Sequence, residues 1–265
     1  MTSEILGEYI PERMIMNKYL KNLDRIEFVV TMACTGRCKH CSEGEHAAAG
    51  EHIDGEIGAQ AVRQICGAYA IQSLMTFGGE PLLYPEDVCK IHGAARECGI
   101  PKRQLITNGF FSRDKERIRE VVRRLAESGV NQILLSADAF HQETIPLETV
   151  LYFGKCVTGE GIPVKLNPAW LVSREHDNPY NMQTREIMKA FADMQIPAAV
   201  GNIIFPAGNA RKYLGEYFKD GAEYENPYDE DPADLHTISF KPDGSALGGN
   251  INRDHILDII AAYRP

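Results

Sequence analysis

Three cysteines stand within eight residues of the chain, at Cys34, Cys38 and Cys41. Gly36 disfavours a continuous helix between them, and the basic side chain of Arg37 favours ionised thiols. Three thiolates in one short loop repel one another unless a cation holds them. The spacing therefore predicts a metal centre in this loop.

Two kinds of metal centre suit these ligands. Structural zinc takes four ligands, and His40 or His46 could supply the fourth. An iron–sulfur cube is usually held by four cysteines, so three would leave one iron open to a small molecule. The spacing alone does not choose between them. His46 and His52 also suggest a second metal site, although we favour a polar loop beside the first centre.

The remaining cysteines and the bulk composition restrict the class of protein. Cys66, Cys89, Cys98 and Cys156 lie in or beside helical patterns, where we expect them to be buried. Seven cysteines without a secretory signal indicate a reducing cytosol. No run approaches ~20 apolar residues, so we expect no membrane span. The net charge of −9 argues against a nucleic-acid partner.

Apolar runs alternate with helical patterns along the chain and would position these residues. The predicted strands are residues 25–33, 73–77, 103–107, 131–137, 163–167 and 198–205. Ser112 is the expected cap of the helix that carries Ile118 and Val121. Such alternation demands parallel pairing, in a partial (β/α)6 barrel or an open doubly wound sheet. We favour the barrel, with a lead over 1–24, a barrel over 25–215, and an acidic linker with a strand–helix cap over 216–265.

Each predicted strand runs into a polar or glycine-rich cluster. In order these are CTGRCKHC, GGEP, TNG, SADAFHQE, NPAW and FPAGNA. Parallel α/β folds place active sites at the carboxyl ends of their strands. The six clusters therefore predict one shared site and an enzyme, independently of the cysteines.

The C-x3-C-x2-C pattern after the first strand and GGEP after the second resemble the radical S-adenosylmethionine superfamily. The resemblance covers about residues 25 to 210. It implies a 4Fe–4S cluster held by Cys34, Cys38 and Cys41, with S-adenosylmethionine chelating the free iron. It also implies reductive cleavage to a 5′-deoxyadenosyl radical that abstracts hydrogen from substrate, with flavodoxin or ferredoxin as electron donor.

The resemblance also implies roles for residues at the strand ends. The glycines of GGEP let backbone approach the ligand, and Glu80 is an acidic partner for a cationic ligand. Asp138 could instead cap a helix, Trp170 could pack in the core, and TNG could be an ordinary turn. The residues assigned to S-adenosylmethionine are His40, Gly78, Gly79, Glu80, Asn108, Ser136, Asp138 and Ile203. The substrate-binding candidates are Thr107, Lys165, Asn167 and Trp170.

The C-terminal segment limits the number of clusters. It resembles the start of the extension found in peptide-modifying members of the superfamily, but Gly248 and Gly249 stand where its first cysteine is expected. No cysteine follows Cys156, so we expect one cluster per chain. The predicted substrate is an unidentified small molecule. Maturation of a ribosomally made peptide is the alternative within this class, and a non-catalytic zinc-binding module is the alternative outside it.

Overall fold

The computed structural model describes residues 17–219, 226 and 228–265. The lead before residue 17 lies outside the described residues, as do Asp220, Glu223 and Glu225 of the acidic linker. Six parallel strands form the main sheet, in the order β5-β4-β3-β2-β1-β8. They are β1 Arg25–Val29, β2 Ser73–Phe77, β3 Lys102–Thr107, β4 Gln132–Leu135, β5 Val164–Leu166 and β8 Thr237–Phe240.

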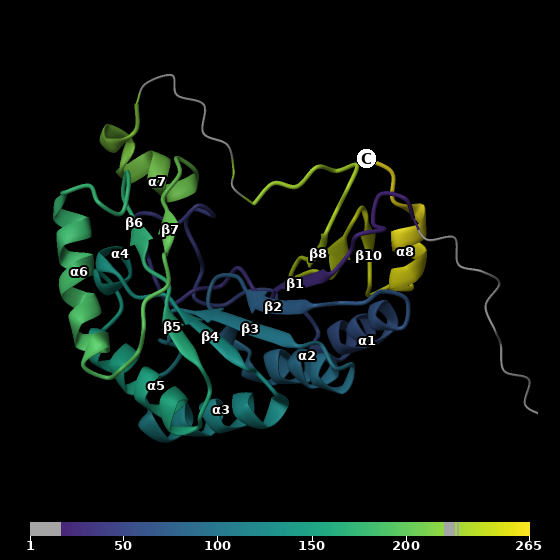
Figure 1. The fold of residues 1–265 in the computed structure, drawn as a ribbon, viewed down its shortest axis with the longest axis horizontal. Coiled ribbons are helices and arrows are strands. Elements are labelled where there is room, and N and C mark those ends of the chain that lie inside the picture. The colour runs from purple at the N-terminus through teal and green to yellow at the C-terminus, as the bar shows by residue number, and fades with distance from the viewer. Residues whose placement is uncertain (1–16, 220–225, 227) are drawn as a thin grey trace, which may run out of the picture.

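Helices cover the convex face of this sheet. Figure 1 shows α1, α2, α3 and α5 packed along its outer side, while α6 and α7 close one end and α8 lies next to α1. The helices are α1 Gly55–Cys66, α2 Pro85–Glu97, α3 Lys115–Ser128, α4 Ala139–Gln142, α5 Leu147–Gly159, α6 Pro179–Ala192, α7 Gly208–Tyr213 and α8 Ile256–Ala262. Short 3-10 turns span η1 Pro81–Leu83 and η2 Gly215–Tyr217. The open, curved sheet with its helices outside is the predicted partial barrel.

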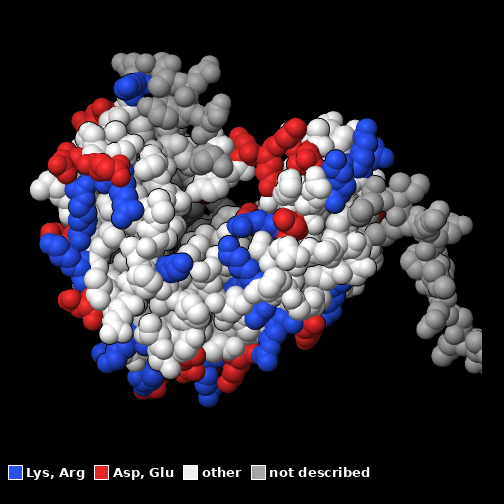
Figure 2. Space-filling view, in the orientation of Figure 1, with Lys and Arg blue, Asp and Glu red and all other residues white. Residues whose placement is uncertain are grey.

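The two faces of the sheet differ in burial because successive side chains point to opposite sides. Leu105, Ile133 and Leu166 face the helices and are buried in the core. Ile106 pairs with Leu134, and Leu134 pairs with Lys165, on the other face. That concave face is only partly covered, and Figure 2 shows the molecule hollowed there, between the α6–α7 side and the β8–α8 side.

The helix boundaries follow local signals. Asp54 caps α1 by accepting hydrogen bonds from the backbone N–H groups of Glu56 and Ile57. Gly129 ends α3 in the left-handed conformation, with φ of 92°. The predicted cap of α3 is wrong: Asp114, not Ser112, accepts from Glu116 N, while the Ser112 hydroxyl accepts from Asp114 N at 3.0 Å. The carboxylate of Asp114, two residues after Ser112, therefore caps α3.

The sixth predicted strand, residues 198–205, is divided. Ala198 bridges Leu166, and Asn202–Ile203 (β7) pairs in parallel with Ala169–Trp170 (β6) in a separate two-stranded sheet. Pro168 interrupts the hydrogen bonding of the fifth strand because proline has no N–H to donate, and its carbonyl accepts from Asn202 N at 2.9 Å. The segment therefore follows the fifth strand as expected, but with a break.

The C-terminal segment contributes to the barrel itself. Its predicted strand is β8, which pairs in parallel with β1 and so forms the opposite edge of the main sheet. The turn after β8 leads to the short hairpin β9 Ser245–Ala246 and β10 Gly249–Asn250, followed by α8. Phe28 of β1 stacks on Phe240 of β8, with ring centroids 4.6 Å apart. The predicted cap is thus continuous with the sheet.

Two expectations concern burial. The four cysteines outside the loop, Cys66, Cys89, Cys98 and Cys156, are half-buried against the core rather than fully enclosed, because each lies on a surface helix or at its end. Among the described helices, none combines the length and apolar character needed to cross a bilayer.

Candidate active site

The three clustered cysteines lie on the loop that follows β1. Cys34 and Cys38 are buried, and Cys41 is half-buried. A Cβ atom added at Gly36 would lie 3.2 Å from the sulfur of Cys38 and 3.7 Å from that of Cys34. The absent side chain therefore leaves both sulfurs room on the same side of the loop.

The electrostatics of this loop favour neutral thiols unless a cation is present. Burial raises the pKa of the Cys34 thiol to about 11. Burial also raises the pKa of Cys38 well above its ordinary value, and the charges of Asp138, Cys34 and Cys41 raise it further. Burial raises the pKa of Cys41 as well. A cationic centre would remove this mutual repulsion, so the three thiols suit a metal cluster.

The GGEP turn packs directly on the chain that leads into the cysteine loop. Gly78 has a φ of 138°, and a Cβ there would lie 2.4 Å from the carbonyl oxygen of Thr31. A Cβ at Gly79 would lie 2.2 Å from the carbonyl oxygen of Ala33. Gly79 N donates to Thr31 O at 2.7 Å, and Glu80 N donates to Ala33 O at 2.8 Å. Only glycine permits this approach of two backbones.

Glu80 is fully buried, and its carboxylate joins the ends of β2 and β3. It accepts from Leu82 N at 2.9 Å, the Thr107 hydroxyl at 2.7 Å and Asn108 N at 2.8 Å. Burial raises the pKa of Glu80 to about 7, against the lowering effect of these donors. These contacts make Glu80 a positioning residue. Its role as partner of a cationic ligand stays a prediction.

Asn108 connects the end of β3 to the cysteine loop. Its Nδ2 lies 3.7 Å from the sulfur of Cys34 and donates to the Thr35 hydroxyl at 3.2 Å. Its Oδ1 accepts from Phe110 N at 2.8 Å. The Thr107 hydroxyl is committed to Glu80 and to Gly109 N, and its side chain is buried. The structure thus places Asn108 against a predicted ligand and Thr107 behind it, away from the concave face.

Asp138 is the cap of α4 that the sequence allowed. Its buried carboxylate accepts from the backbone N–H groups of Phe140, His141 and Ala169, and Oδ2 lies 2.9 Å from Nδ1 of His141. Burial acts to raise the pKa of Asp138, but His141 and these donors hold it well below its usual range. Asp138 therefore fixes His141, and with it the start of α4, beside the cysteine loop.

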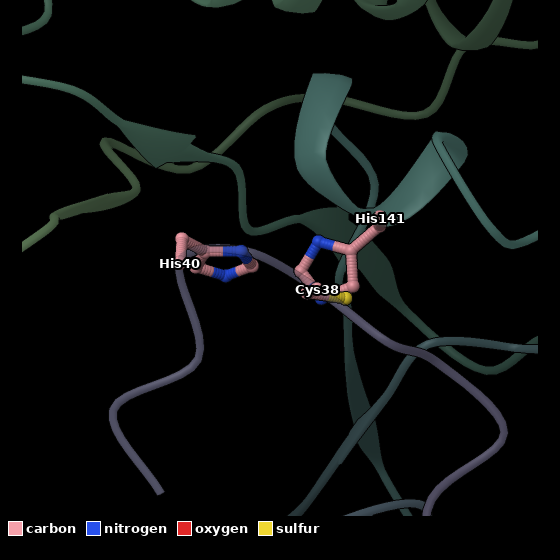
Figure 3. A group of neighbouring side chains, drawn as sticks. All are labelled: Cys38, His40 and His141. Atoms are coloured by element: carbon pink, nitrogen blue, oxygen red, sulfur yellow. The ribbon is translucent and has the colours of Figure 1, made fainter. Parts of the chain in front are cut away.

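His40 lies between the cysteine loop and α4. Its ring centroid is 5.1 Å from that of Phe140 and 4.8 Å from that of His141. Figure 3 shows the two imidazoles beside the Cys38 sulfur, and ligating atoms of these three residues all lie within 4.8 Å of one another. Burial lowers the pKa of His40 to about 4, so its imidazole is neutral at physiological pH. His141 is thus a neighbour of the predicted cluster.

Asn209, at the start of α7, was not predicted to have a role. Its backbone N–H donates to Cys41 O at 2.9 Å, and its side-chain amide donates to the carbonyls of Cys38 and Gly44, both at 3.1 Å. A Cβ at Gly208 would lie 2.3 Å from the carbonyl of Ser42. The FPAGNA turn therefore holds the cysteine loop from 171 residues away in sequence. In the sequence, Asn209 could have been noticed only as a polar residue just after a predicted strand.

The remaining candidates divide between the concave face and the interior. Lys165 is exposed on the concave face, and Ser136 and Asn167 are half-buried at the ends of β4 and β5. Ile203 is 47% exposed on β7. Trp170 is 2% exposed, and its indole N–H donates to Val200 O at 2.9 Å. This burial favours the packing interpretation of Trp170, and its role as a substrate contact stays a prediction.

The described residues do not assemble a zinc site from the three cysteines and a histidine. A zinc ion bonds sulfur at about 2.3 Å, so its four ligands must approach one another closely. The group with ligating atoms within 4.8 Å contains only one cysteine, Cys38. His46 Nε2 lies 3.1 Å from the sulfur of Cys41 alone. Thiolates of a cluster bind different irons and need no such approach, so the three cysteines fit a cluster better than zinc.

Comparison with known proteins gives the family. A family model described as the Radical SAM superfamily matches residues 28–206. A GTP 3′,8-cyclase of Clostridium perfringens (strain SM101 / Type A) is 25% identical over 194 residues, which cover 65% of this chain and 58% of that protein. A GTP 3′,8-cyclase of Chlorobaculum tepidum is 23% identical over 136 residues, 51% of this chain and 39% of that protein. The chain thus spans less than two thirds of the curated relatives it matches.

Solved structures share the fold. Streptococcus suis SuiB bound to precursor peptide SuiA matches with a TM-score of 0.55 and 14% identity, covering 91% of this chain and 65% of that chain. Native anSMEcpe with bound AdoMet and Kp18Cys peptide matches with a TM-score of 0.57 and 14% identity, covering 91% and 81%. The family match spans most of the barrel, from β1 to the turn before α7, and includes all three clustered cysteines. The chain therefore belongs to the radical SAM superfamily of enzymes.

Proposed function

We propose that the chain holds one 4Fe–4S cluster through Cys34, Cys38 and Cys41, and binds S-adenosylmethionine at the iron that lacks a protein ligand. Superfamily membership implies an iron–sulfur cluster and S-adenosylmethionine as cofactors. The observation that carries the proposal is the packing of Gly79 against the chain leading into Cys34, which brings a second strand end to the thiols. When bound, these cofactors supply a 5′-deoxyadenosyl radical that abstracts hydrogen from the substrate.

The chain's own residues prepare this site. Asn209 and Gly208 hold the backbone of the cysteine loop, and the Asn108 amide donates toward the sulfur of Cys34. Such donors orient metal ligands and tune the metal. Glu80 fixes Asn108 by accepting its backbone N–H. The protein thereby sets the position of the thiols before any cofactor binds.

The S-adenosylmethionine site lies among the strand ends in this proposal. The backbone of Gly78 and Gly79 would bind the amino group, and Ser136 at the end of β4 would bind the ribose or methionine part. Ile203, exposed on β7, would pack on the adenine, and His40 would hold it from the other side of the site. Ser136 and Ile203 are not fully buried, which leaves them available for contact.

For the substrate we propose a small molecule with an anionic group. Lys165 is exposed on the concave face beside Leu134, and it forms no ion pair with another described residue. An unpaired ammonium over an apolar neighbour suits a carboxylate or phosphate attached to a larger body. The curated relatives are named for GTP, which is an anionic small molecule. Asn167, at the end of the same strand, is the second proposed contact.

A peptide substrate is the second candidate. SuiB and anSMEcpe, whose folds match, were solved with peptides. The open concave face would admit an extended chain (Figure 2). The curated relatives are named for a nucleotide and not for a peptide. We therefore place the small molecule first. The proposed compartment is the reducing cytosol, where the thiols stay available.

Anaerobic reconstitution with iron and sulfide tests the proposal. We expect a brown protein with about four irons per chain, which forms 5′-deoxyadenosine from S-adenosylmethionine when reduced with dithionite. Cys38→Ala should lose both the iron and the product, whereas Cys156→Ala, outside the loop on α5, should keep both. A colourless wild-type protein with stoichiometric zinc would establish the zinc-binding alternative. Full iron and product in Cys38→Ala would show that the ligand assignment is wrong.

A further inference from the structure

A groove of about 620 Å³ lies on the outer surface between α3 and α5. These two helices are neighbours on the convex side of the sheet (Figure 1). The floor of the groove is apolar and aromatic, with Ile118, Tyr152 and Met194. Its charged lining comprises Arg113, Lys115, Lys155 and Glu148. The groove therefore carries three cations and one acid on a chain whose net charge is −9.

The three cations are available to a partner. Arg113, Lys115 and Lys155 are exposed, and none forms an ion pair with another described residue. The ion pairs of α3 instead use Arg117, Arg119, Arg123 and Arg124. Lys115 lies 5.1 Å from the centre of the Tyr152 ring, and Arg113 lies 5.7 Å from that of Phe110. Aromatic rings thus hold two of the charges in place without neutralising them.

The chain segments that precede α3 and α5 both contact the cysteine loop. On the α3 side, the Asn108 amide lies 3.7 Å from the Cys34 sulfur, and Asn108 Oδ1 accepts from Phe110 N at 2.8 Å. Phe110 is the ring beneath Arg113. A continuous series of contacts therefore leads from a predicted cluster ligand to the rim of the groove.

The α5 side makes a second connection. Arg37 N, between two predicted cluster ligands, donates to the Thr144 hydroxyl at 3.1 Å. A Cβ at Gly36 would lie 3.3 Å from Ile145 Cδ1. Thr144 and Ile145 immediately precede α5, which starts at Leu147. Arg37 is itself exposed, so the cysteine loop carries a positive charge between two of the predicted ligands.

The arrangement suits an acidic protein surface better than a small anion. The cations are spread over two helices, with Arg113 and Lys115 at the start of α3 and Lys155 eight residues into α5. The α3 N-terminus is not open to a phosphate, because the Asp114 carboxylate already accepts from Glu116 N. Spread charges over an apolar floor match a complementary surface, and they steer its approach.

We infer that this groove is the docking surface for an acidic one-electron donor protein of the flavodoxin or ferredoxin class. The inference rests on the proposed function, since it presumes an electron acceptor at Cys34, Cys38 and Cys41. One electron passes from the reduced donor to the acceptor, and the donor is oxidised by one electron. No bond forms or breaks at the groove, whose role is to hold the donor near the cysteine loop.

The test measures binding of a purified acidic flavodoxin to the reconstituted full-length chain under anaerobic conditions. Arg113→Glu/Lys115→Glu reverses two charges at the groove, and Lys21→Glu/Arg253→Glu makes the matched change on exposed residues away from α3 and α5. The groove variant should raise the Kd by about tenfold or more and weaken its salt dependence, while the control stays within about twofold of wild type. Circular dichroism confirms that both variants fold.

Several outcomes would overturn the inference. The first is a wild type that does not bind flavodoxin, and the second is an equal loss of flavodoxin affinity in the groove and control variants. The third is a groove variant that loses binding of inorganic phosphate but keeps binding of flavodoxin. Dithionite-driven formation of 5′-deoxyadenosine should be unchanged in the groove variant, because dithionite needs no docking surface. If the wild type forms no product with dithionite yet binds flavodoxin through the groove, the proposed function fails and the docking surface stands.

Discussion

Replacing Gly79 with alanine tests the closest backbone contact in the site. The added methyl carbon would lie 2.2 Å from Ala33 O and 2.9 Å from Met32 O, well inside the usual contact distance of about 3.5 Å. The two segments must separate, which breaks the bonds from Gly79 N to Thr31 O and from Glu80 N to Ala33 O. Two hydrogen bonds contribute about 2 kcal/mol, and forced overpacking costs about 1–3 kcal/mol. We therefore expect the free energy of unfolding to fall by about 3–5 kcal/mol.

Gly93→Ala is the matched control for this substitution. Gly93 lies inside α2, and a Cβ there meets no atom within 4 Å. Alanine should therefore stabilise the helix, by about 0.5–1 kcal/mol. Urea denaturation of the reduced apoprotein, followed by circular dichroism, measures both variants without any cofactor. If Gly79→Ala lowers the free energy of unfolding by less than about 1 kcal/mol, the backbone is not as close as described and the reasoning is refuted.

Three further predictions concern other buried contacts. Burial lowers the pKa of His92 to about 3, below the unfolded value of about 6.5. Between these two values the unfolded chain binds a proton that the folded chain does not, so stability falls as the pH falls below about 6.5. His92→Gln is the control, because glutamine keeps an acceptor for Thr76. In urea titrations the free energy of unfolding of the wild type should fall by about 2 kcal/mol more than that of the variant between pH 7 and pH 5. Equal dependence on pH in the two proteins would contradict this. Asn209→Ala leaves the carbonyls of Cys38 and Gly44 without their side-chain donor, and should lower the free energy of unfolding by about 1–3 kcal/mol. The variant should also retain less iron on gel filtration. Unchanged iron retention would show that Asn209 does not support the site. Trp170→Phe should cost about 1–3 kcal/mol in thermal unfolding, because the smaller ring leaves a cavity where a buried side chain stood. A loss of substrate affinity without a loss of stability would restore the ligand-stacking role.

The elements of the barrel could be predicted because their signals are local. The apolar run at 73–77 is strand β2, and the run at 103–107 is β3 apart from its first residue, Lys102. Strands that are buried under helices leave apolar runs in the sequence, and the helices between them leave apolar residues at helical spacing. The cap of α3 could not be fixed in this way, because Ser112 and Asp114 are both good capping residues and only the path of the chain selects Asp114.

Long-range pairing was beyond local reasoning. The sequence indicated a strand in the C-terminal segment, but not that β8 would pair with β1 as the far edge of the sheet. Likewise, nothing local showed that the fifth and sixth strands would form separate short pairs beyond Pro168. Sheet order depends on hydrogen bonds between residues that are remote in sequence, and the same strand pattern is compatible with several orders.

For the site, the sequence by itself determined the chemistry. The spacing of Cys34, Cys38 and Cys41 and the glycines of GGEP are short motifs whose residue types restrict what they can bind, and the family match confirms the superfamily they indicated. Only the tertiary structure decided which neighbours serve those residues. It turned Glu80 inward to hold Asn108, buried Trp170, and brought His141 and Asn209 to the cysteine loop. Motifs specify ligand chemistry through side-chain type, whereas positioning contacts arise where distant strand ends converge, and that convergence exists only in the folded chain.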